Sequence, residues 1–479
     1  MKQYRNIEFG PSSLSPCTNG ATQKLVKVII LLAMSMVLFG CTEFVEVDPP
    51  KNTLVLETVF DDPGTVESAL ANLYFDMREQ GMVSGSRGLT LMMGIYSDEL
   101  DYFGFNADMS QFYRHNVLAV NNITSTWWSQ AYHLIYGAND LLQGISDSDS
   151  LTEIEKKRFM GQAFFIRAYI HSLLVSVYGD VPYITTTDYR QNNSVSRNTT
   201  ESVYENIIED LIRSVDALDG LEPASGERVM PDYYAAKALL ARMYLYTENW
   251  EMAESLSMEL IQTFSLENEL DEVFLKDSEE TIWQLKADVE FPLNTREAEQ
   301  LIIQAVPGQN YALTENLLEA FETGDQRKNH WVASISDLDN TVTFHYPYKY
   351  KAGINETESL EYSIVFRLAE QYLIRAEARA KMGNLQGAQK DLNAIRNRAG
   401  LPNTNAVSMG ELLNAITKER RTELFTEHGF RWFDLKRTGR ADEVIGDLKP
   451  NWKNTDVLLP IPENELETNP NLLPQNDGY

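Results

Sequence analysis

Apolar residues recur every three or four positions along much of the chain, which is the spacing of one face of an α-helix. Asp62-Pro63 is typical of a helix start, with a capping carboxylate and then proline at the first helical position. The apolar series that follows predicts a helix there: Val66, Ala69, Leu70, Leu73, Tyr74 and Met77. The same spacing predicts helices over residues 127–142, 153–178 and 203–215, so the pattern favours a mostly α-helical protein.

Two helix pairs resemble one another. The first combines Leu240-Ala241-x2-Tyr244 with Asn249-Trp250 and Ala253, and the second combines Ala376-x2-Arg379 with Gly383-Asn384-Leu385 and Ala388. Small residues at matching points let paired helices approach closely, which is the tetratricopeptide pattern. The copies lie more than a hundred residues apart, so we expect scattered repeats packed together across insertions.

Extended and irregular segments interrupt the helices. Residues 81–94 form a glycine-rich break, and residues 98–105 have the aromatic and acidic composition of a loop. Within a long insertion, about residues 265–365, the stretches 281–286 and 341–350 alternate or gather aromatics in the manner of strands. Irregular insertions on a helical scaffold commonly carry binding surfaces.

The N-terminus indicates export. A polar stretch with Lys24 and Lys27 precedes an apolar run over residues 28–39, which is shorter than the ~20 residues that span a bilayer and fits the core of a signal peptide. The run ends in Gly40-Cys41, which resembles the bacterial lipobox. We therefore expect a signal peptide over residues 1–40, lipid on Cys41, and an acidic tether over residues 41–60. The alternative interpretation is a buried cysteine.

Composition narrows the classes of function. Hydrophobic residues make up 43% and charged residues 23%, as in a folded globular protein. Asp and Glu number 70 against 41 Lys and Arg, for a net charge of -29, so nucleic acid and anionic membrane surfaces are poor partners. Two cysteines exclude a disulfide framework. The six histidines lack metal-ligand spacing, and neither a nucleophile elbow nor a phosphate-binding loop is found.

The C-terminal part carries a specific combination of motifs. It contains Phe366-Arg367-Leu368-Ala369-Glu370-x-Tyr372-Leu373-Ile374-Arg375-Ala376-Glu377-Ala378 and Glu419-Arg420-Arg421-x-Glu423-Leu424-x2-Glu427-x-Gly429-x-Arg431-Trp432-Phe433-Asp434. Leu459-Pro460-Ile461-Pro462 and Gln475-Asn476-x-Gly478-Tyr479 follow, and Tyr178-Gly179-Asp180-Val181-Pro182-Tyr183 lies upstream. Together with the lipobox, this pattern resembles the SusD/RagB family of nutrient-binding outer-membrane lipoproteins of Bacteroidota.

The resemblance implies a mostly α SusD-like fold, with scattered tetratricopeptide-like pairs and an irregular ligand lobe with few short strands. It implies one intertwined body with an N-terminal region over residues 61–265 and a C-terminal region over residues 266–479. It further implies a protein lipid-anchored in the outer membrane, facing outward, that captures an oligosaccharide or peptide. Delivery to a SusC-like TonB-dependent transporter would follow, with neither catalysis nor a cofactor.

Candidate ligand residues combine aromatic rings, which stack on the C–H faces of sugars, with polar groups that bind hydroxyls. They lie in the two irregular regions from which this family takes its ligand residues: Asp101, Tyr102, Phe103, Phe105, Asn106, Phe112, Tyr113 and Arg114 in the first, and Trp331, His345, Tyr346 and Tyr348 in the second. Each of these rings has core packing as its alternative.

Other interpretations of the same residues stay open. Asp98, Glu99 and Asp101 could form a calcium site or a glycosidase pair. A tetratricopeptide-type scaffold that binds protein or peptide is the rival to nutrient capture. Glu419, Arg420, Arg421 and Glu423 are expected to form a structural ion-pair network, Trp432 and Phe433 to pack the core, and the last residues to dock the C-terminus.

Overall fold

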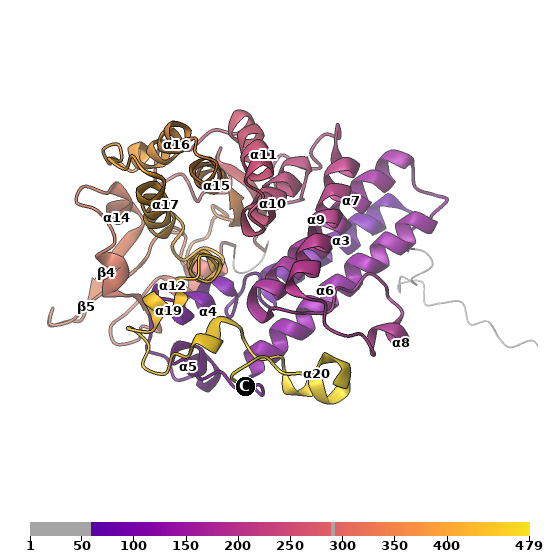
Figure 1. The fold of residues 1–479 in the computed structure, drawn as a ribbon, viewed down its shortest axis with the longest axis horizontal. Coiled ribbons are helices and arrows are strands. Elements are labelled where there is room, and N and C mark those ends of the chain that lie inside the picture. Colours follow the sequence, from indigo (N-terminus) through magenta and orange to yellow (C-terminus); the bar gives the residue numbers. More distant parts are fainter. Residues whose placement is uncertain (1–58, 289–292) are drawn as a thin grey trace, which may run out of the picture. The chain divides into compact units, whose positions relative to one another are not determined.

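The computed structural model describes residues 59–288 and 293–479. In this part of the chain there are eighteen α-helices and six short strands (Figure 1). The predicted mostly α fold class is therefore confirmed. The described residues belong to one compact unit. The predicted signal peptide, Cys41 and nearly all of the tether lie outside the described residues.

Long helices dominate the first half of the described chain. α7 (Glu153–Tyr178) packs between α6 (Asn122–Asp147) and α9 (Thr200–Leu218), and α3 (Pro63–Glu79) lies against α6 and α7. α7 spans the predicted residues and begins with a capping box between Thr152 and Glu155. α3 begins at Pro63 as predicted, although the Asp62 side chain makes no capping hydrogen bond. Among the described residues, α7 alone is long and apolar enough to cross a membrane, and 89% of its apolar window is buried inside the protein.

The two resembling helix pairs form antiparallel hairpins that pack together. α10 (Tyr233–Tyr246) pairs with α11 (Trp250–Thr263), and α15 (Leu368–Lys381) pairs with α16 (Leu385–Arg398). α11 lies directly against α15, so the segments that are distant in sequence meet (Figure 1). The small residues Ala241, Ala253, Ala376 and Ala388 are all fully buried. Their identity as tetratricopeptide repeats stays a prediction.

Three two-stranded antiparallel sheets link distant parts of the chain. β2 (Thr281–Leu285) pairs with β6 (Ser363–Arg367) in the core, β1 (Leu100–Tyr102) with β3 (Tyr311–Leu313), and β4 (Val332–Ser336) with β5 (Thr343–Pro347). The strands predicted at 281–286 and within 341–350 are confirmed as β2 and β5. The predicted loop at 98–105 instead contains β1, because β3 supplies a pairing partner more than two hundred residues away.

The glycine-rich break over residues 81–94 contains a helix that the pattern did not predict. α4 (Leu89–Tyr96) has all eight residues buried, so it lacks the polar face that gives an amphipathic helix its periodicity. Ser97 ends this helix and leads directly into Asp98 and β1. α4 therefore places the acidic segment of the candidate site.

The remaining helices of the described residues are α5 (Ala107–Tyr113), α8 (Tyr189–Asn192), α12 (Arg296–Leu301), α13 (Glu315–Leu318), α14 (Gln326–His330), α17 (Met409–Glu423), α18 (Phe430–Arg437), α19 (Ala441–Ile445), α20 (Glu463–Thr468), and the 3-10 turns η1 (Asn454–Val457) and η2 (Pro470–Leu472).

The C-terminal segment docks onto the body, as predicted. Asn476 Nδ2 donates to Tyr178 O at 2.8 Å and to Leu459 O at 2.7 Å, while Tyr479 Oη donates to Leu458 O at 3.0 Å. Trp432 and Phe433 are buried, which confirms their predicted place in the core.

Candidate ligand-binding site

The two irregular regions that were predicted to carry ligand residues meet at β3. β3 pairs with β1 and also lies beside β5, so the end of β1 reaches the β4–β5 hairpin. The rings of Phe103 and Phe344 pack edge to face, with centroids 5.2 Å apart. Phe103 is 40% exposed, and Phe105 projects fully into solvent. We call Phe103, Phe105 and Phe344 the aromatic platform.

Neighbouring residues hold the backbone of the platform in place. The Tyr102 ring packs against Tyr311, and Tyr102 Oη accepts a hydrogen bond from Asn106 N at 3.0 Å. Asn106 also caps α5 by accepting from Met109 N at 3.0 Å. A Cβ on Gly104 would lie 2.5 Å from Tyr102 Oη, so this tight crossing requires glycine. Tyr102 and Asn106 therefore shape the loop that presents the exposed phenylalanines.

A polar pocket of about 390 Å³ lies next to the segment that carries the platform. Asp101, Tyr113, Arg114, Lys449 and Asn451 are among its lining residues. Tyr113 Oη donates to Asp101 Oδ1 at 2.9 Å, and Lys449 Nζ lies 3.8 Å from the centroid of the Tyr113 ring. Burial lowers the pKa of Lys449 to about 8, against the opposing effect of the Asp101 and Asp98 carboxylates. The pocket thus offers a hydrogen-bonding carboxylate, a phenol and a cation beside exposed rings.

A larger basin of about 810 Å³ shares Asn316 and Leu448 with the polar pocket. Its lining is mostly charged or polar and includes Arg421, Arg431 and Arg440. The two hollows therefore adjoin, and together they provide room for a ligand longer than the platform alone could hold.

Asp98 forms the boundary between these hollows and the core. Arg431 binds it through two hydrogen bonds of 2.7 and 2.9 Å, and Arg421 Nη2 donates to it at 2.6 Å. Although burial raises the pKa of Asp98, the two guanidinium groups outweigh that effect and leave the pKa below its usual value. Among the described residues, no group of three or more His, Cys, Asp or Glu side chains is arranged to hold a metal ion. The calcium interpretation of Asp98, Glu99 and Asp101 therefore has no support from the geometry.

Glu99 is buried beside Asp98 and has a different ionisation state. Its Oε2 accepts from Thr426 N at 3.2 Å, while its Oε1 has no hydrogen-bond partner among the described residues. Burial and, secondarily, the Asp98 charge raise the pKa of Glu99 from 4.5 to about 8. Glu99 is therefore protonated at neutral pH in the folded protein.

The raised pKa of Glu99 predicts a pH-dependent stability. Between pH 4.5 and 8 the folded state keeps a proton that the unfolded state has released, so stability falls as pH rises through this window. Glu99→Gln cannot titrate and imitates the neutral acid. We expect urea unfolding to show a smaller loss of stability between pH 5 and pH 8 for Glu99→Gln than for the unmodified protein. Equal losses would contradict a raised Glu99 pKa.

Several candidate ligand residues are placed away from solvent. Trp331 is fully buried and donates from Nε1 to Leu270 O at 2.8 Å, and Phe112 is fully buried against Tyr96 and Trp127. Neither ring offers a face to a ligand, so both predictions are corrected: these aromatics pack the core.

The remaining candidates in the second region are half-buried. Tyr346 lies on the same face of β5 as Phe344, because side chains alternate along a strand, whereas His345 points to the opposite face. The Tyr348 ring packs edge to face against Tyr346. Tyr346 can extend the platform, and His345 cannot do so from its face.

Phe344 and Lys449 are residues of the site that were not among the predicted ligand residues. Phe344 lies within residues 341–350, a stretch with the aromatic pattern of a strand. This pattern therefore includes the position just before the predicted His345. Lys449 has no local signal, because only the fold brings it over Tyr113.

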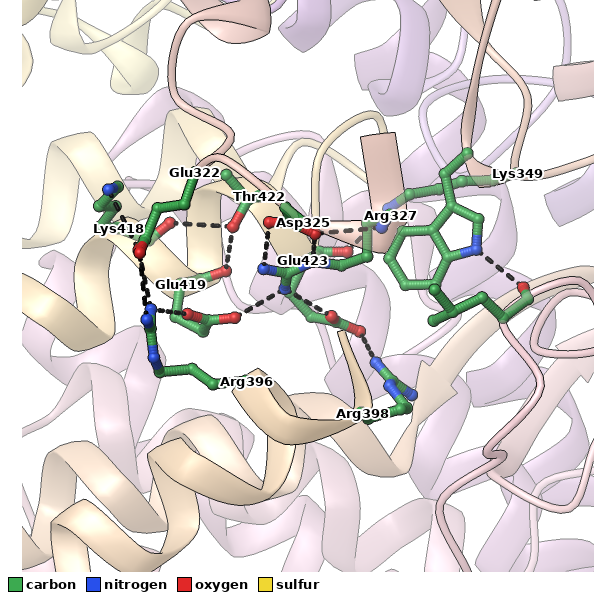
Figure 2. Close-up of polar contacts among 12 residues, drawn as sticks. Glu322, Asp325, Arg327, Lys349, Arg396, Arg398, Lys418, Glu419, Thr422 and Glu423 are labelled. Atoms are coloured by element: carbon green, nitrogen blue, oxygen red, sulfur yellow. Dashed lines mark hydrogen bonds and ion pairs between the residues drawn. The ribbon is translucent and has the colours of Figure 1, made fainter. Parts of the chain in front are cut away.

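The charged motif residues on α17 form a buried ion network, as predicted. Figure 2 shows Glu419 and Glu423 directed toward Arg327, with Arg396 and Arg398 at the two ends. Glu423 also binds Arg367, which in turn binds Glu280 and Glu427. Arg420 pairs with Asp434, and Arg421 reaches Asp98. These contacts join α17 to the strand and loop segments that support the platform, so their role is structural.

Comparison with known proteins agrees with this architecture. Residues 43–245 match a family model described as starch-binding and associating with the outer membrane, and residues 279–479 match the SusD family model. SusD-like protein P2 of Formosa agariphila is 28% identical, covering 94% of this chain and 99% of the relative.

Solved structures share the fold. A SusD superfamily protein from Bacteroides vulgatus superimposes with a TM-score of 0.78 at 22% identity, covering 88% of this chain and all of that one. A laminarin-binding SusD-like protein superimposes with a TM-score of 0.74 at 24% identity, covering 87% of this chain and 99% of that one. With both halves matched by models of one family, the chain belongs to the SusD/RagB family.

Proposed function

We propose that this protein captures an oligosaccharide at the cell surface, on the aromatic platform and in the adjoining polar pocket. The observation that carries the proposal is the meeting of Phe103 with Phe344 beside the exposed Phe105. Exposed aromatic rings are costly in water unless a partner covers them, and sugars present C–H faces that rings can cover. Asp101, Tyr113 and Arg114 then supply hydrogen-bond partners for hydroxyl groups.

Glucans are the first ligands to test. A structural neighbour is described as laminarin-binding, and one family model is described as starch-binding. These descriptions concern other proteins, and the platform here has its own residues. They support a carbohydrate ligand and leave the choice of glycan to experiment.

Binding without catalysis is part of the proposal. A glycosidase needs one carboxyl group to protonate the leaving group and a second one to act as nucleophile or base. Two arginines form ion pairs with the Asp98 carboxylate. Glu99 is buried, and one of its carboxyl oxygens has no hydrogen-bond partner among the described residues. Asp98 and Asp101 both line the polar pocket. Of these two, only Asp101 has no arginine partner among the described residues. One such acid supports ligand binding rather than hydrolysis.

Delivery completes the proposed function. A lipid on Cys41 would anchor the chain to the outer membrane with the site facing outward, and a SusC-like TonB-dependent transporter would receive the ligand. Support for this part comes from the lipobox and the family membership. Substitution of Cys41 by Ala, followed by fractionation of the membranes, tests the anchor separately from the ligand.

The experiment for the ligand is a binding screen of the purified protein against laminarin, starch and a panel of other plant and algal glycans, with released sugar measured in parallel. We expect retention on at least one glycan without release of product. If the unmodified protein releases sugar and the Asp101→Asn variant does not, the protein is a glycosidase and the capture hypothesis is wrong. Binding of peptides alone would favour the tetratricopeptide-type scaffold.

A further inference from the structure

A second cavity lies apart from the platform, between α6 and the C-terminal α20–η2 segment. Its volume is about 340 Å³, at the lower end of the range for ligand pockets. Pro182 and Ile184 lie beneath it, and the end of α8 closes one side. It shares no lining residue with the polar pocket or the basin. In Figure 1, α8 and α20 are well separated from the β4–β5 hairpin.

One wall of this cavity is a row of aromatic side chains. Trp128, Tyr132 and Tyr136 are four residues apart on α6, so they lie above one another on one face of the helix. The rings of Trp128 and Tyr132 are 5.0 Å apart, and Tyr132 Oη donates to Pro182 O at 2.9 Å. Tyr136 is 46% exposed. The row is therefore fixed at one end and open to solvent at the other.

The other walls present hydrogen-bond acceptors. Asn192 Nδ2 donates to Thr186 O at 2.7 Å, while Asn192 Oδ1 is buried and has no hydrogen-bond partner among the described residues. Glu465 lines the cavity and receives hydrogen bonds from the side chains of Asn464, at 3.0 Å, and Trp128. The Glu465 carboxylate has two acceptor oxygens, so it can accept further hydrogen bonds from ligand hydroxyl groups.

The lining also selects for charge. Glu465 is its one titratable acid, and the cavity lining contains neither lysine nor arginine. An anionic ligand would meet a carboxylate in the lining, with the nearby Arg197 outside it, whereas a neutral hydroxylated ring would place its C–H face on the tyrosines and its hydroxyls on Glu465.

We propose that this cavity is a second saccharide site, which takes one or two neutral sugar residues stacked on the Tyr132–Tyr136 row. The class of ligand rests on the proposed glycan-binding function, whereas the location does not depend on the platform. Trp128, Tyr132 and Tyr136 form the apolar wall, and Glu465 accepts hydrogen bonds from the sugar hydroxyls.

Calorimetric titration with laminaritriose, maltotriose and cellotriose tests the proposal. The background is the full protein with Phe103→Ala and Phe105→Ala, which removes the two most exposed rings of the platform. We expect at least one trisaccharide to bind this background, and Tyr136→Ala to weaken that binding at least tenfold. Tyr189→Ala is the matched control, because Tyr189 is also an exposed tyrosine yet lies outside the cavity lining, and it should leave binding unchanged.

A variant that fills the cavity shows whether the loss of binding comes from the cavity itself or from the removal of an aromatic ring. Ser129 is an exposed residue of the lining, so Ser129→Arg fills the cavity without removing an aromatic ring, and it should abolish the residual binding. Failure of all three trisaccharides to bind the background, or equal binding by the Tyr136→Ala and Tyr189→Ala variants, would overturn the second site. If binding to the unmodified protein survives loss of the platform without change and depends on Tyr136, the platform fails and the second site stands.

Discussion

Arg367→Met should reduce the free energy of unfolding by about 3–5 kcal/mol, because breaking a buried ion pair leaves its partners charged and uncompensated. Arg367 is buried and binds three carboxylates: Nη1 lies 2.6 Å from Glu423 and 3.0 Å from Glu280, and Nε lies 2.8 Å from Glu427. Methionine would fill part of the volume and satisfy none of these groups. Urea unfolding of the purified proteins measures the loss.

Lys286→Met is the matched control for Arg367→Met. Lys286 pairs with Glu227 at 2.6 Å, yet the side chains are 47% and 43% exposed, so solvent screens the pair. Its loss should cost no more than about 1 kcal/mol. A variant of Arg367 that fails to fold agrees with the expectation, whereas an Arg367→Met protein as stable as Lys286→Met would show that the network does not hold the fold.

The same network explains why so many charges are buried in one place. Arg327, Arg367 and Arg398 all contact Glu423, and Lys349 and Arg367 share Glu427. Attraction to these cations holds the pKa of Glu423 well below its usual value despite complete burial. Attraction to Arg367 and Lys349 likewise holds the pKa of Glu427 below its usual value, so both acids stay ionised and removal of a single cation has a large effect.

Removal of the platform should have the largest effect on ligand affinity. Phe103→Ala with Phe105→Ala deletes two exposed rings, each of which can cover part of a sugar face. At roughly 25 cal/mol per Å² of apolar surface, we expect a loss of about 2–3 kcal/mol. This corresponds to a Kd weaker by about 30- to 150-fold for whichever glycan the screen identifies. Calorimetry measures the change.

Phe75→Ala is the control for the platform variant. Phe75 is 44% exposed on α3, so it matches the chemistry of the deleted rings and the exposure of Phe103, away from β1 and β5. Its affinity should equal that of the unmodified protein. Because Phe103 and Phe105 are exposed, the platform variant should unfold at nearly the same urea concentration. Unchanged glycan affinity with an intact fold would exclude the platform as the ligand site.

The local pattern of apolar and polar residues was sufficient to predict a helix that has one buried and one exposed face. The start of α3 follows from Asp62-Pro63, and α9 follows from apolar residues that recur once per turn on its buried face. α4 escaped prediction because its eight buried residues have no polar face. β1 escaped because a three-residue strand exists only through its partner β3. Elements whose stability comes from distant contacts leave little local pattern.

The candidate site shows the same division. The residue types of the 101–106 and 345–348 segments indicated ligand binding, and Phe103 meets Phe344, one position before the second segment. Trp331 has the same composition signal and is nevertheless buried, because an aromatic ring in an irregular segment serves core and surface equally well. Lys449 joins the polar pocket from a segment without any local signal. The fold decides whether a ring is buried and which distant residues come together. The sequence could therefore suggest these residues as ligand contacts, but it could not separate core residues from surface residues.

The most direct test of glycan capture on the platform is a crystal structure of the protein with a bound oligosaccharide from the screen. We expect a sugar ring stacked on Phe103 or Phe105, with hydroxyl groups bonded to residues of the polar pocket such as Asp101 or Arg114. A sugar bound elsewhere, with Phe103, Phe105 and Phe344 still uncovered, would contradict it.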